Sequence, residues 1–452
     1  MKVVIIGNGK VGSSLSSLLA KENHDVTVVD CKPEALRRTQ FTQDIMCIEG
    51  NGATAATQKE AGADKAGLLI ACTPYDELNI LCCLIAKRLG ADRTISRVRT
   101  PEYFTQMDLL RDELRLSLVI NPDLTAAEEI SRILIFPAAA KVEVFEKGKM
   151  ELIEHKLSEN SKICGMSLAD IYRSHKIKFL ICAVARDSEI YIPDGSFVLR
   201  PGDKISLAAS HKNVEKFFRE TGIIAGKVKN VMMIGGGRVC YYLASLLLNV
   251  GMRVKIIEKD LDRCHILAEK LPKASIIHGD GTDQELLMEE GLSDADSFVA
   301  LTGLDEENII MSMFAKNNSK AKVIVKINRD NYRDLASELG LDCIVSPKSL
   351  TTSSILSYVR SLNNTSGSNI ESLYHIVNNQ VEAIEFCIKT NIPGLVGVPL
   401  RDMKLKKNIL ICAIIRRRNV IIPNGGDSIE LGDFVVVISK DHRFSDIEDI
   451  LM

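Results

Sequence analysis

The chain has 452 residues, of which 46% are apolar and 26% charged, and its formal net charge is −2. This length exceeds one ordinary hydrophobic core and predicts three or four domains. The near-neutral charge argues against a basic surface that binds nucleic acid or anionic lipid. The longest apolar runs are far shorter than the roughly 18 residues of a membrane helix, so we expect no direct membrane insertion.

The first predicted elements are a strand, a glycine turn, a helix and a second strand. The run Lys2–Ile6 is apolar and β-branched, which predicts a strand buried on both faces rather than a secretory signal. From Val11 to Leu19 the apolar positions follow helical spacing, and Asp25–Asp30 predicts a strand that ends on a carboxylate. The turn between the first strand and the helix is Gly7-Asn8-Gly9-Lys10-Val11-Gly12.

Each glycine of this turn has a mechanical use in a nucleotide site. Gly7 allows the tight turn, Gly9 lets phosphates approach the backbone, and Gly12 lets the helix pack on the strand. The helix N-terminus favours an anion there. Asp30 lies 18 residues after Gly12, where a carboxylate accepts hydrogen bonds from a ribose diol. The pattern favours NAD, ATP or ADP over NADP, and the alternative is an empty structural turn.

Cysteine and histidine show no metal-ligand spacing. The twelve cysteines are scattered through apolar segments and include no Cys-x-x-Cys pair. We interpret them as reduced core residues of a cytoplasmic protein. The eight histidines are also dispersed, so we expect no metal site.

The second half of the chain repeats the first. Val231–Cys240 restates Val3–Gly12 at an offset of 228 residues, and Glu258 takes the place of Asp30. The likeness continues through these further pairs of segments: Ile48–Gly52 and Ile277–Gly281, Ala71–Thr73 and Ala300–Thr302, Asp76–Asn79 and Asp305–Asn308, Arg97–Arg99 and Lys326–Asn328, Ile120–Pro122 and Val345–Pro347.

Each copy alternates strand-like runs with helical segments, which predicts an open, doubly wound parallel α/β sheet. Ligands of such sheets bind beyond the carboxyl ends of the strands. Asn51, Thr73 and Arg97 follow predicted strands, so we expect them at the same rim as the glycine loop. The alternative is that Thr73-Pro74 is only a turn and Arg97 a solvated strand end.

A different segment follows each copy. Short runs such as Leu180–Val184 and Lys204–Leu207 are joined by Pro-Asx-Gly and Gly-Asp turns, and the second half repeats them at Leu410–Ile414 and Phe434–Val437. These signals predict two small antiparallel α+β domains, each with one or two helices. We place joints near residues 136–141, 221–229 and 361–368. The four predicted domains span residues 1–125, 140–222, 228–350 and 369–452.

The doubled arrangement resembles the TrkA family of bacterial and archaeal potassium-uptake regulators, which are built of two tandem RCK modules. The resemblance covers nearly the whole chain. It is carried by Gly7–Val11 with Asp30, Gly50–Gly52, Thr73–Asn79, Arg97–Arg99 and their second-half counterparts. It implies two Rossmann-like domains that alternate with two small RCK C-terminal domains.

The resemblance also implies the residues that bind NAD(H), or ATP or ADP as the alternative. For the first site they are Gly7, Asn8, Gly9, Lys10, Val11, Gly12, Asp30, Asn51, Thr73, Pro74 and Arg97. For the second site they are Gly235, Gly236, Gly237, Arg238, Val239, Glu258, Asp280 and Thr302, with Lys326 as a further candidate. The second copy departs from the pattern, because Cys240 replaces the third glycine and Lys326 replaces an arginine.

By the same resemblance, the protein is a cytoplasmic regulatory subunit and not an enzyme. The resemblance further implies that the protein would lie on the inner face of the membrane through a TrkH- or TrkG-like potassium translocator. We expect it to assemble as a homo-oligomer, with four chains giving a ring of eight modules, and we expect nucleotide to change the ring and so gate ion flow.

Two other functions stay open. An NAD-dependent oxidoreductase would need an acid or base near the nicotinamide, and the nearest arrangement in the small domains is Tyr172–His175, which the second half lacks. Regulation of a potassium channel or exporter is the other, because the same modules serve both.

Overall fold

The computed structural model describes residues 1–42, 45–111, 113–135, 141–145, 149–175, 177–187, 189–221, 227–329, 331–363, 369–376, 380–417, 419–440, 444 and 446–452. The three predicted joints lie largely outside these ranges. The described residues form four sheets, two parallel and two antiparallel, in alternation along the chain. The two kinds of domain in the prediction are therefore confirmed.

The first parallel sheet has the strand order β3-β2-β1-β4-β5-β6. Along its central strand, Val3 and Ile5 enter the core on one face while Val4 and Ile6 enter the core on the other. This double burial explains why the sequence of the strand is continuously apolar. The strands are β1 (Lys2–Ile6), β2 (Asp25–Asp30), β3 (Met46–Glu49), β4 (Leu68–Ala71), β5 (Thr94–Arg97) and β6 (Leu118–Ile120).

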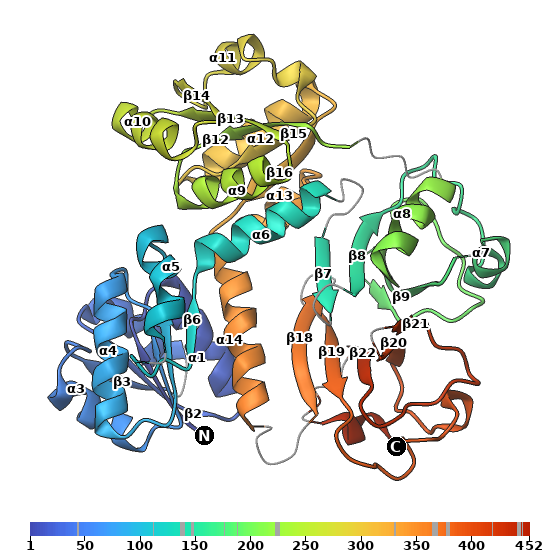
Figure 1. Cartoon of the computed structure of the whole chain (residues 1–452), viewed down its shortest axis with the longest axis horizontal. Coiled ribbons are helices and arrows are strands. Elements are labelled where there is room, and N and C mark those ends of the chain that lie inside the picture. The colour runs from blue at the N-terminus through green and yellow to red at the C-terminus, as the bar shows by residue number, and fades with distance from the viewer. Residues whose placement is uncertain are drawn as a thin grey trace.

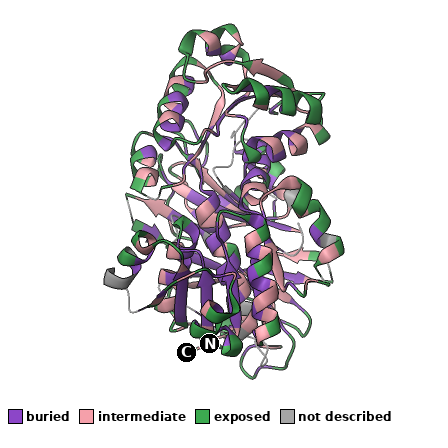
Figure 2. Cartoon of the chain, turned by 90° about the vertical axis from the view of Figure 1, so that its left-hand side faces the viewer, coloured by how far each residue is buried: buried purple, intermediate pink, exposed green. Residues whose placement is uncertain are grey.

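Helices cover both faces of this sheet, and their exposed sides face solvent (Figure 2). α1 buries Val11, Leu15 and Leu19 at helical spacing against one face. The helices are α1 (Lys10–Lys21), α2 (Pro33–Thr42), α3 (Ala55–Glu60), α4 (Asp76–Leu89) and α5 (Pro101–Leu110).

The second parallel sheet repeats this order as β14-β13-β12-β15-β16-β17. Its strands are β12 (Asn230–Ile234), β13 (Arg253–Glu258), β14 (Ser275–His278), β15 (Ser297–Ala300), β16 (Lys322–Lys326) and β17 (Cys343–Val345). Its helices are α9 (Arg238–Asn249), α10 (Leu261–Lys270), α11 (Gln284–Glu289), α12 (Asp305–Asn318) and α13 (Asn331–Glu338).

The helix that follows each parallel sheet packs on the other sheet. α6 (Pro122–Ile135) lies against α9, and its Ile130 and Leu134 are buried in the core of the second sheet. α14 (Pro347–Asn363) lies against α1, and its Ile355 and Val359 are buried in the core of the first sheet. Figure 1 shows this exchange, with α6 under the upper domain and α14 beside the lower left one. The predicted limit at residue 125 falls inside α6.

The first small domain is a five-stranded antiparallel sheet of order β10-β9-β11-β8-β7 with two helices. Gly202 has a φ of +85°, as the predicted Gly-Asp turn before β11 requires. The elements are β7 (Lys141–Phe145), β8 (Met150–Lys156), α7 (Leu168–Ser174), β9 (Phe179–Arg186), β10 (Glu189–Tyr191), β11 (Lys204–Ala209) and α8 (His211–Glu220).

The second small domain has the order β18-β19-β22-β20-β21. Its described residues contain only 3-10 turns, Leu400–Asp402 and Ile447–Ile450, where one or two helices were predicted. The strands are β18 (Ile370–Ile376), β19 (Val381–Cys387), β20 (Ile409–Arg416), β21 (Asn419–Ile421) and β22 (Phe434–Lys440).

The two small sheets pack on each other in one shared core. Phe145 meets Tyr374 edge-on, with ring centroids 4.7 Å apart, and Cys182 and Cys412 are buried in the same cluster. The two small domains therefore form a pair, which lies beside the crossing helices α6 and α14, on the right in Figure 1.

Candidate functional site

The first glycine loop has the geometry that its sequence predicts. Gly7 has a φ of +98°, and a Cβ there would lie 3.0 Å from the Thr73 nitrogen, so a side chain would be both strained and crowded. Gly9 is the N-cap residue of α1, and a Cβ at this position would meet nothing within 4 Å. The loop is thus open at Gly9, where a ligand would approach.

Gly12 serves packing. A Cβ on Gly12 would lie 1.9 Å from the Gly7 carbonyl oxygen, which leaves no room for a side chain. At the equivalent place in the second half, Cys240 is fully buried with its Sγ 3.8 Å from the Met233 sulfur.

Asp30 lies beside the glycine loop at the end of β2. Its Oδ2 accepts a hydrogen bond from the Asn8 backbone nitrogen at 2.7 Å, and its Oδ1 accepts one from the Lys32 nitrogen at 2.9 Å. A carboxylate has about four acceptor positions, so capacity remains for hydroxyl donors. The Asn8 side chain instead donates to the Ala35 carbonyl at 2.7 Å, so it is directed into α2.

The ends of β4 and β5 are held together by Asn79, which is fully buried on α4. Its Oδ1 accepts from the Thr73 nitrogen at 2.8 Å, and its Nδ2 donates to the Arg97 carbonyl at 2.9 Å. Arg97 also donates to the Thr73 carbonyl. The asparagine of the repeated Asp-Glu-x-Asn motif therefore positions Thr73 and Arg97 at the rim of the sheet.

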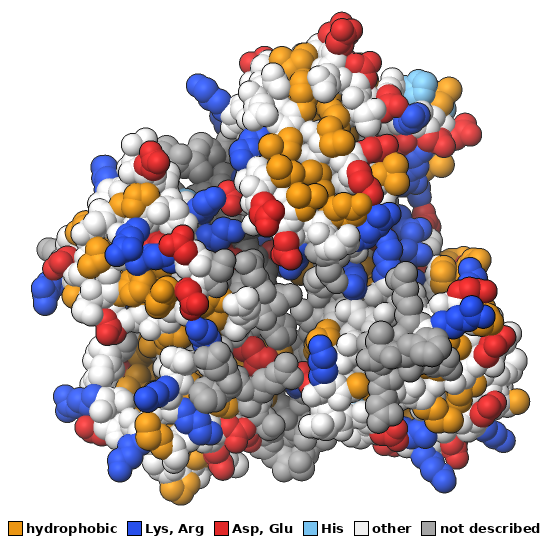
Figure 3. All heavy atoms as spheres, turned by 180° about the vertical axis from the view of Figure 1, so that it is seen from behind, with side chains coloured by type: hydrophobic (Ala, Val, Ile, Leu, Met, Phe, Trp, Pro, Cys, Tyr) orange, Lys and Arg blue, Asp and Glu red, His pale blue; other side chains and the backbone are white. Residues whose placement is uncertain are grey.

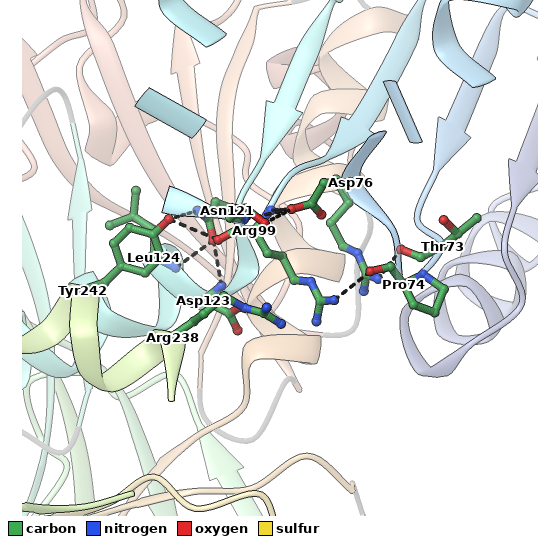
Figure 4. A network of polar contacts seen from close by, with 11 residues as sticks. Thr73, Pro74, Asp76, Arg99, Asn121, Asp123, Leu124, Arg238 and Tyr242 are labelled. Atoms are coloured by element: carbon green, nitrogen blue, oxygen red, sulfur yellow. Dashed lines mark hydrogen bonds and ion pairs between the residues drawn. The ribbon is translucent and has the colours of Figure 1, made fainter. Parts of the chain in front are cut away.

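Arg99 is a rim residue that the site prediction did not include. Its Nη2 donates to the Pro74 carbonyl at 3.0 Å, and its backbone nitrogen donates to Asp76 Oδ2 at 3.0 Å (Figure 4). Burial, with the adjacent positive charge of Arg97, lowers the pKa of Arg99. Among the described residues, the Nε atoms of Arg97 and Arg99 are buried without a hydrogen-bond partner.

These residues open on a cavity of about 630 Å³. From the predicted first site, the described wall includes Gly7, Gly9, Lys10, Val11, Asp30, Asn51, Thr73, Pro74 and Arg97. Asn8 and Gly12 are not among the described residues that line the cavity. The second half of the chain contributes Val239, Lys326, Asn328, Pro347 and Lys348 to the same wall.

The charge of this wall is mainly positive. Its described cations are Lys10, Lys32, Arg97, Arg99, Lys326 and Lys348, and its carboxylates are Asp30 and Asp123. Burial is the main reason that the pKa of Lys326 is lowered, and the charge of Lys10 adds to this effect. A cavity with this balance favours an anionic ligand.

The sequence predicted Lys326 for the second site, but the structure places it in the wall of the first. The exchange of α6 and α14 brings the two rims face to face, so one cavity receives side chains from both. Lys32, Asp123 and Lys348 were missed, because they belong to no repeated motif.

A polar network joins the two halves beside the cavity (Figure 4). Tyr242 on α9 donates to the Arg99 carbonyl at 3.1 Å and accepts from Asn121 Nδ2 at 2.8 Å. Arg238 forms an ion pair with Asp123, with Nε and Oδ2 2.9 Å apart. The N-terminal part of α9, which follows the second glycine loop, is therefore bound to residues at the rim of the first parallel sheet.

The second glycine loop has the same backbone but a different surrounding. Gly235 has a φ of +88°, and Gly236 donates its N–H to Glu258. Arg263 on α10 donates to the Gly236 carbonyl at 2.7 Å, and the equivalent residue beside the first loop is Ala35. Gly237 is open, with nothing within 4 Å of an added Cβ.

The remaining predicted residues of the second site lie at its rim. Asp280 forms an ion pair with Lys259 at 2.7 Å, and this hydrogen bond is the main reason that the pKa of Asp280 falls to about 2. Thr302 is held by Asn308, as Thr73 is by Asn79. Glu258, Asp280 and Thr302 are not among the described residues that line the large cavity.

The sequence matches two family models, each of them twice. TrkA-N matches residues 3–122 and 231–347, and TrkA-C matches residues 152–222 and 385–452. The chain is 33% identical over 451 residues to a Trk system potassium uptake protein TrkA homolog of Archaeoglobus fulgidus, covering 100% of both chains. The chain belongs to the TrkA family.

A second relative agrees with this family, and two solved structures share the fold of the chain. A TrkA of Haemophilus influenzae is 31% identical over 450 residues, covering 98% of this chain and 96% of that one. Among solved structures, the GsuK channel superposes with a TM-score of 0.66 at 17% identity, covering 97% of this chain and 77% of the channel. The GsuK channel bound to NAD gives 0.64, also at 17% identity, with the same two coverages. These two structures support the fold of this TrkA family member.

Among the described residues, no group of three or more histidine, cysteine or acidic side chains is placed to hold a metal ion. The helices that the structure describes include none with the length and hydropathy needed to span a bilayer.

Proposed function

We propose that this protein is a regulatory subunit of a Trk-type potassium uptake system and binds NAD(H) or an adenine nucleotide in the cavity at its first glycine loop. The observation that carries this proposal is that both halves of the chain build one positively charged cavity. A ligand there would contact both halves and could set the angle between them.

In this proposal the ligand's adenosine lies at Asp30 and its phosphates lie at the open loop. The carboxylate accepts hydrogen bonds from the ribose diol and repels a 2′-phosphate, which favours NAD(H), ATP or ADP over NADP. The phosphates lie over Gly9 and the N-terminus of α1, where backbone N–H groups and the helix dipole favour an anion. Lys10 and Lys326 would then face the phosphates from opposite halves.

The names of the relatives support this proposal. The curated relatives are potassium uptake proteins of the Trk system, and they align over their full length. The GsuK structures are titled as bound to NAD and, in another case, to ADP. Both ligands carry an adenosine diphosphate group, which suits a loop that accepts two phosphates.

We propose that copies of the chain assemble into a ring, with four chains giving eight modules. We call the two domains that contain the parallel sheets the nucleotide domains. They expose apolar side chains at equivalent positions of α4 and α12, with Leu81 46% and Ile310 62% exposed. Tyr75 and Leu304, just before these helices, are 67% and 52% exposed. Figure 3 shows apolar side chains grouped on the second nucleotide domain. Repeated apolar surfaces of this kind favour contact with further copies.

The test is equilibrium titration of the full chain with NADH, ATP and ADP, using Asp30→Ala and a matched control. The control is Asp25→Ala, because Asp25 is exposed at the other end of the same strand. A charge-assisted hydrogen bond contributes about 1.5–3 kcal/mol, so Asp30→Ala should weaken binding about tenfold or more. Equal affinities in wild type and Asp30→Ala would contradict the site.

Two further measurements separate the alternatives. Steady oxidation of NADH with a cellular carbonyl compound would instead indicate an oxidoreductase. Co-purification from membranes would identify the partner: a potassium translocator of the uptake type supports the proposal, and a channel or exporter supports the other regulatory function.

A further inference from the structure

Arg360, near the end of α14, contacts carboxylates from two different domains. Its Nη2 lies 2.5 Å from Glu22 Oε1 in the first nucleotide domain, and its Nε lies 3.2 Å from the same oxygen. Its Nη1 lies 3.3 Å from Glu382 Oε1 on β19 of the second small domain. The guanidinium is therefore the bridge between these two carboxylates.

The bridge is largely shielded from solvent. The side chains of Arg360, Glu22 and Glu382 are 11%, 15% and 11% exposed. Shielding of this kind reduces screening by salt, so the contacts are stronger than those of a surface ion pair. The planar fork of arginine also fixes the direction of each contact, which an ammonium group would not do.

Glu22 is connected to the glycine loop by a single helix. It is the C-cap residue of α1, and Gly9 of the loop is the N-cap residue of the same helix. The 12 residues of α1 make a rod of about 18 Å. Because α1 packs along α14, a tilt of its N-terminus would move Glu22 against Arg360.

The residues equivalent to Arg360 and Glu22 are uncharged in the other half of the chain. Aligning Pro122 of α6 with Pro347 of α14 places Ile135 at the position of Arg360, and aligning Lys10 with Arg238 places Val250 at the position of Glu22. Ile135 and Val250 are 45% and 57% exposed. Two aliphatic side chains therefore take the places of an ion pair, so the two joints of this internal repeat differ in chemistry.

We propose that Arg360 is a positioning residue that transmits occupancy of the first glycine loop to the second small domain, through Glu22 and Glu382. This inference rests on the proposed nucleotide binding at that loop. The first nucleotide domain and the second small domain then respond together. The joint of the other half, built on Ile135 and Val250, transmits less.

The experiment is hydrogen exchange with mass spectrometry on the full chain, with and without saturating NADH. In the wild type we expect NADH to slow the exchange of the amides of β19, residues Val381–Cys387. The main variant is Glu22→Val with Arg360→Ile and Glu382→Gln. Its first two changes copy Val250 and Ile135 of the other joint. The third leaves no buried carboxylate opposite a missing arginine, so the variant should fold. We expect it to bind NADH while the slowing of exchange in β19 is lost.

The control variant is Lys270→Met. Lys270 pairs with Glu102 between the two halves of the chain, and both side chains are partly exposed, so this change leaves no buried carboxylate without a partner. It should leave the response of β19 as in the wild type. Glu22→Gln is a milder second variant, which keeps the contact between Arg360 and Glu382 and should reduce the response.

The outcomes separate the two proposals. A wild type that does not bind NADH would contradict the proposed nucleotide function with this ligand, and the transmission with it. A triple variant that binds NADH and still slows exchange in β19 would overturn the role of Arg360 alone. The same holds for a wild type that binds NADH without any change in β19.

Discussion

Arg238, the first residue of α9, is bound to Asp123 near the start of α6, with Nε and Oδ2 2.9 Å apart. In the internal repeat, the equivalent pair is Lys10 and Lys348, two cations that both line the large cavity. One of these two equivalent pairs is thus an ion pair within the protein. The other is a pair of positive charges, which an anionic ligand can bridge.

We expect Asp123→Asn to tighten the binding of ATP more than that of NADH. Asp123 is one of two described carboxylates in the cavity wall, so its neutralisation makes the wall more positive. The gain should be about fivefold for ATP, since a partly exposed charge pair is worth about 1 kcal/mol at most. Titration at two salt concentrations measures it. Glu102→Gln is the control, because Glu102 also forms an ion pair between the halves, with Lys270, but is not among the described residues that line the cavity. An unchanged ATP affinity in Asp123→Asn would count against the electrostatic account.

Lys326→Met should weaken ADP binding although Lys326 belongs to the second half. Its Nζ donates to the Leu301 carbonyl at 2.9 Å, and the side chain lines the cavity opposite the first loop. Loss of one charged contact to phosphate should reduce affinity about tenfold. Lys322→Met on the same strand is the control, because Lys322 is not among the described lining residues. Equal affinities of Lys326→Met and wild type would mean that the ligand does not reach the second half.

Gly9→Ala and Gly12→Ala should separate binding from folding. A methyl group on Gly9 meets no protein atom within 4 Å, so the variant should keep its melting temperature and lose nucleotide affinity where phosphates approach the backbone. A methyl group on Gly12 meets the Gly7 carbonyl oxygen at 1.9 Å and should destabilise the first domain by about 1–3 kcal/mol. Calorimetric unfolding measures the stability of both variants, and titration with NADH measures the affinity of Gly9→Ala. A Gly12→Ala protein as stable as wild type would show that the loop can shift to accept the side chain.

The ion pair between Lys259 and Asp280 should make a small contribution to stability that depends on pH. The hydrogen bond from Lys259 is the main reason that the pKa of Asp280 is lowered to about 2 in the folded protein, from its ordinary value of 3.8. A lowered carboxyl pKa stabilises the fold above the unfolded value, and this contribution is lost as pH falls from about 3.8 to about 2. Lys259→Gln should raise the pKa of Asp280, measured by the carboxyl carbon chemical shift during acid titration. The same pKa in both proteins would exclude Lys259 as the cause.

Much of the fold could be predicted because the chain contains an internal repeat, so each structural pattern occurs twice. The paired glycine loops and strand-end residues predicted two parallel sheets, and the Gly-Asp turns predicted the antiparallel domains between them. The exchange of α6 and α14 could not be predicted, because the apolar stripe of Ile130 and Leu134 shows that α6 is buried without showing on which sheet. The same limit applies to Lys326, whose place follows from the exchange.

The candidate site shows the same division. The sequence located Asp30 and the open glycine from their spacing alone, since local strand and helix geometry decides those positions. It also predicted Asn8 as a ligand contact, which stays a prediction for the backbone of Asn8, because the side chain donates to Ala35 and Thr39 of α2. Asp123 and Lys348 were missed because contacts between the halves leave no local pattern in the sequence.

The most direct test of the central claim is an experimental structure of the full chain determined with NADH bound. We predict that the adenosine ribose lies within hydrogen-bond distance of Asp30, with the phosphates over Gly9 and between Lys10 and Lys326. A structure in which the protein's own side chains fill this cavity and NADH binds elsewhere would contradict the account.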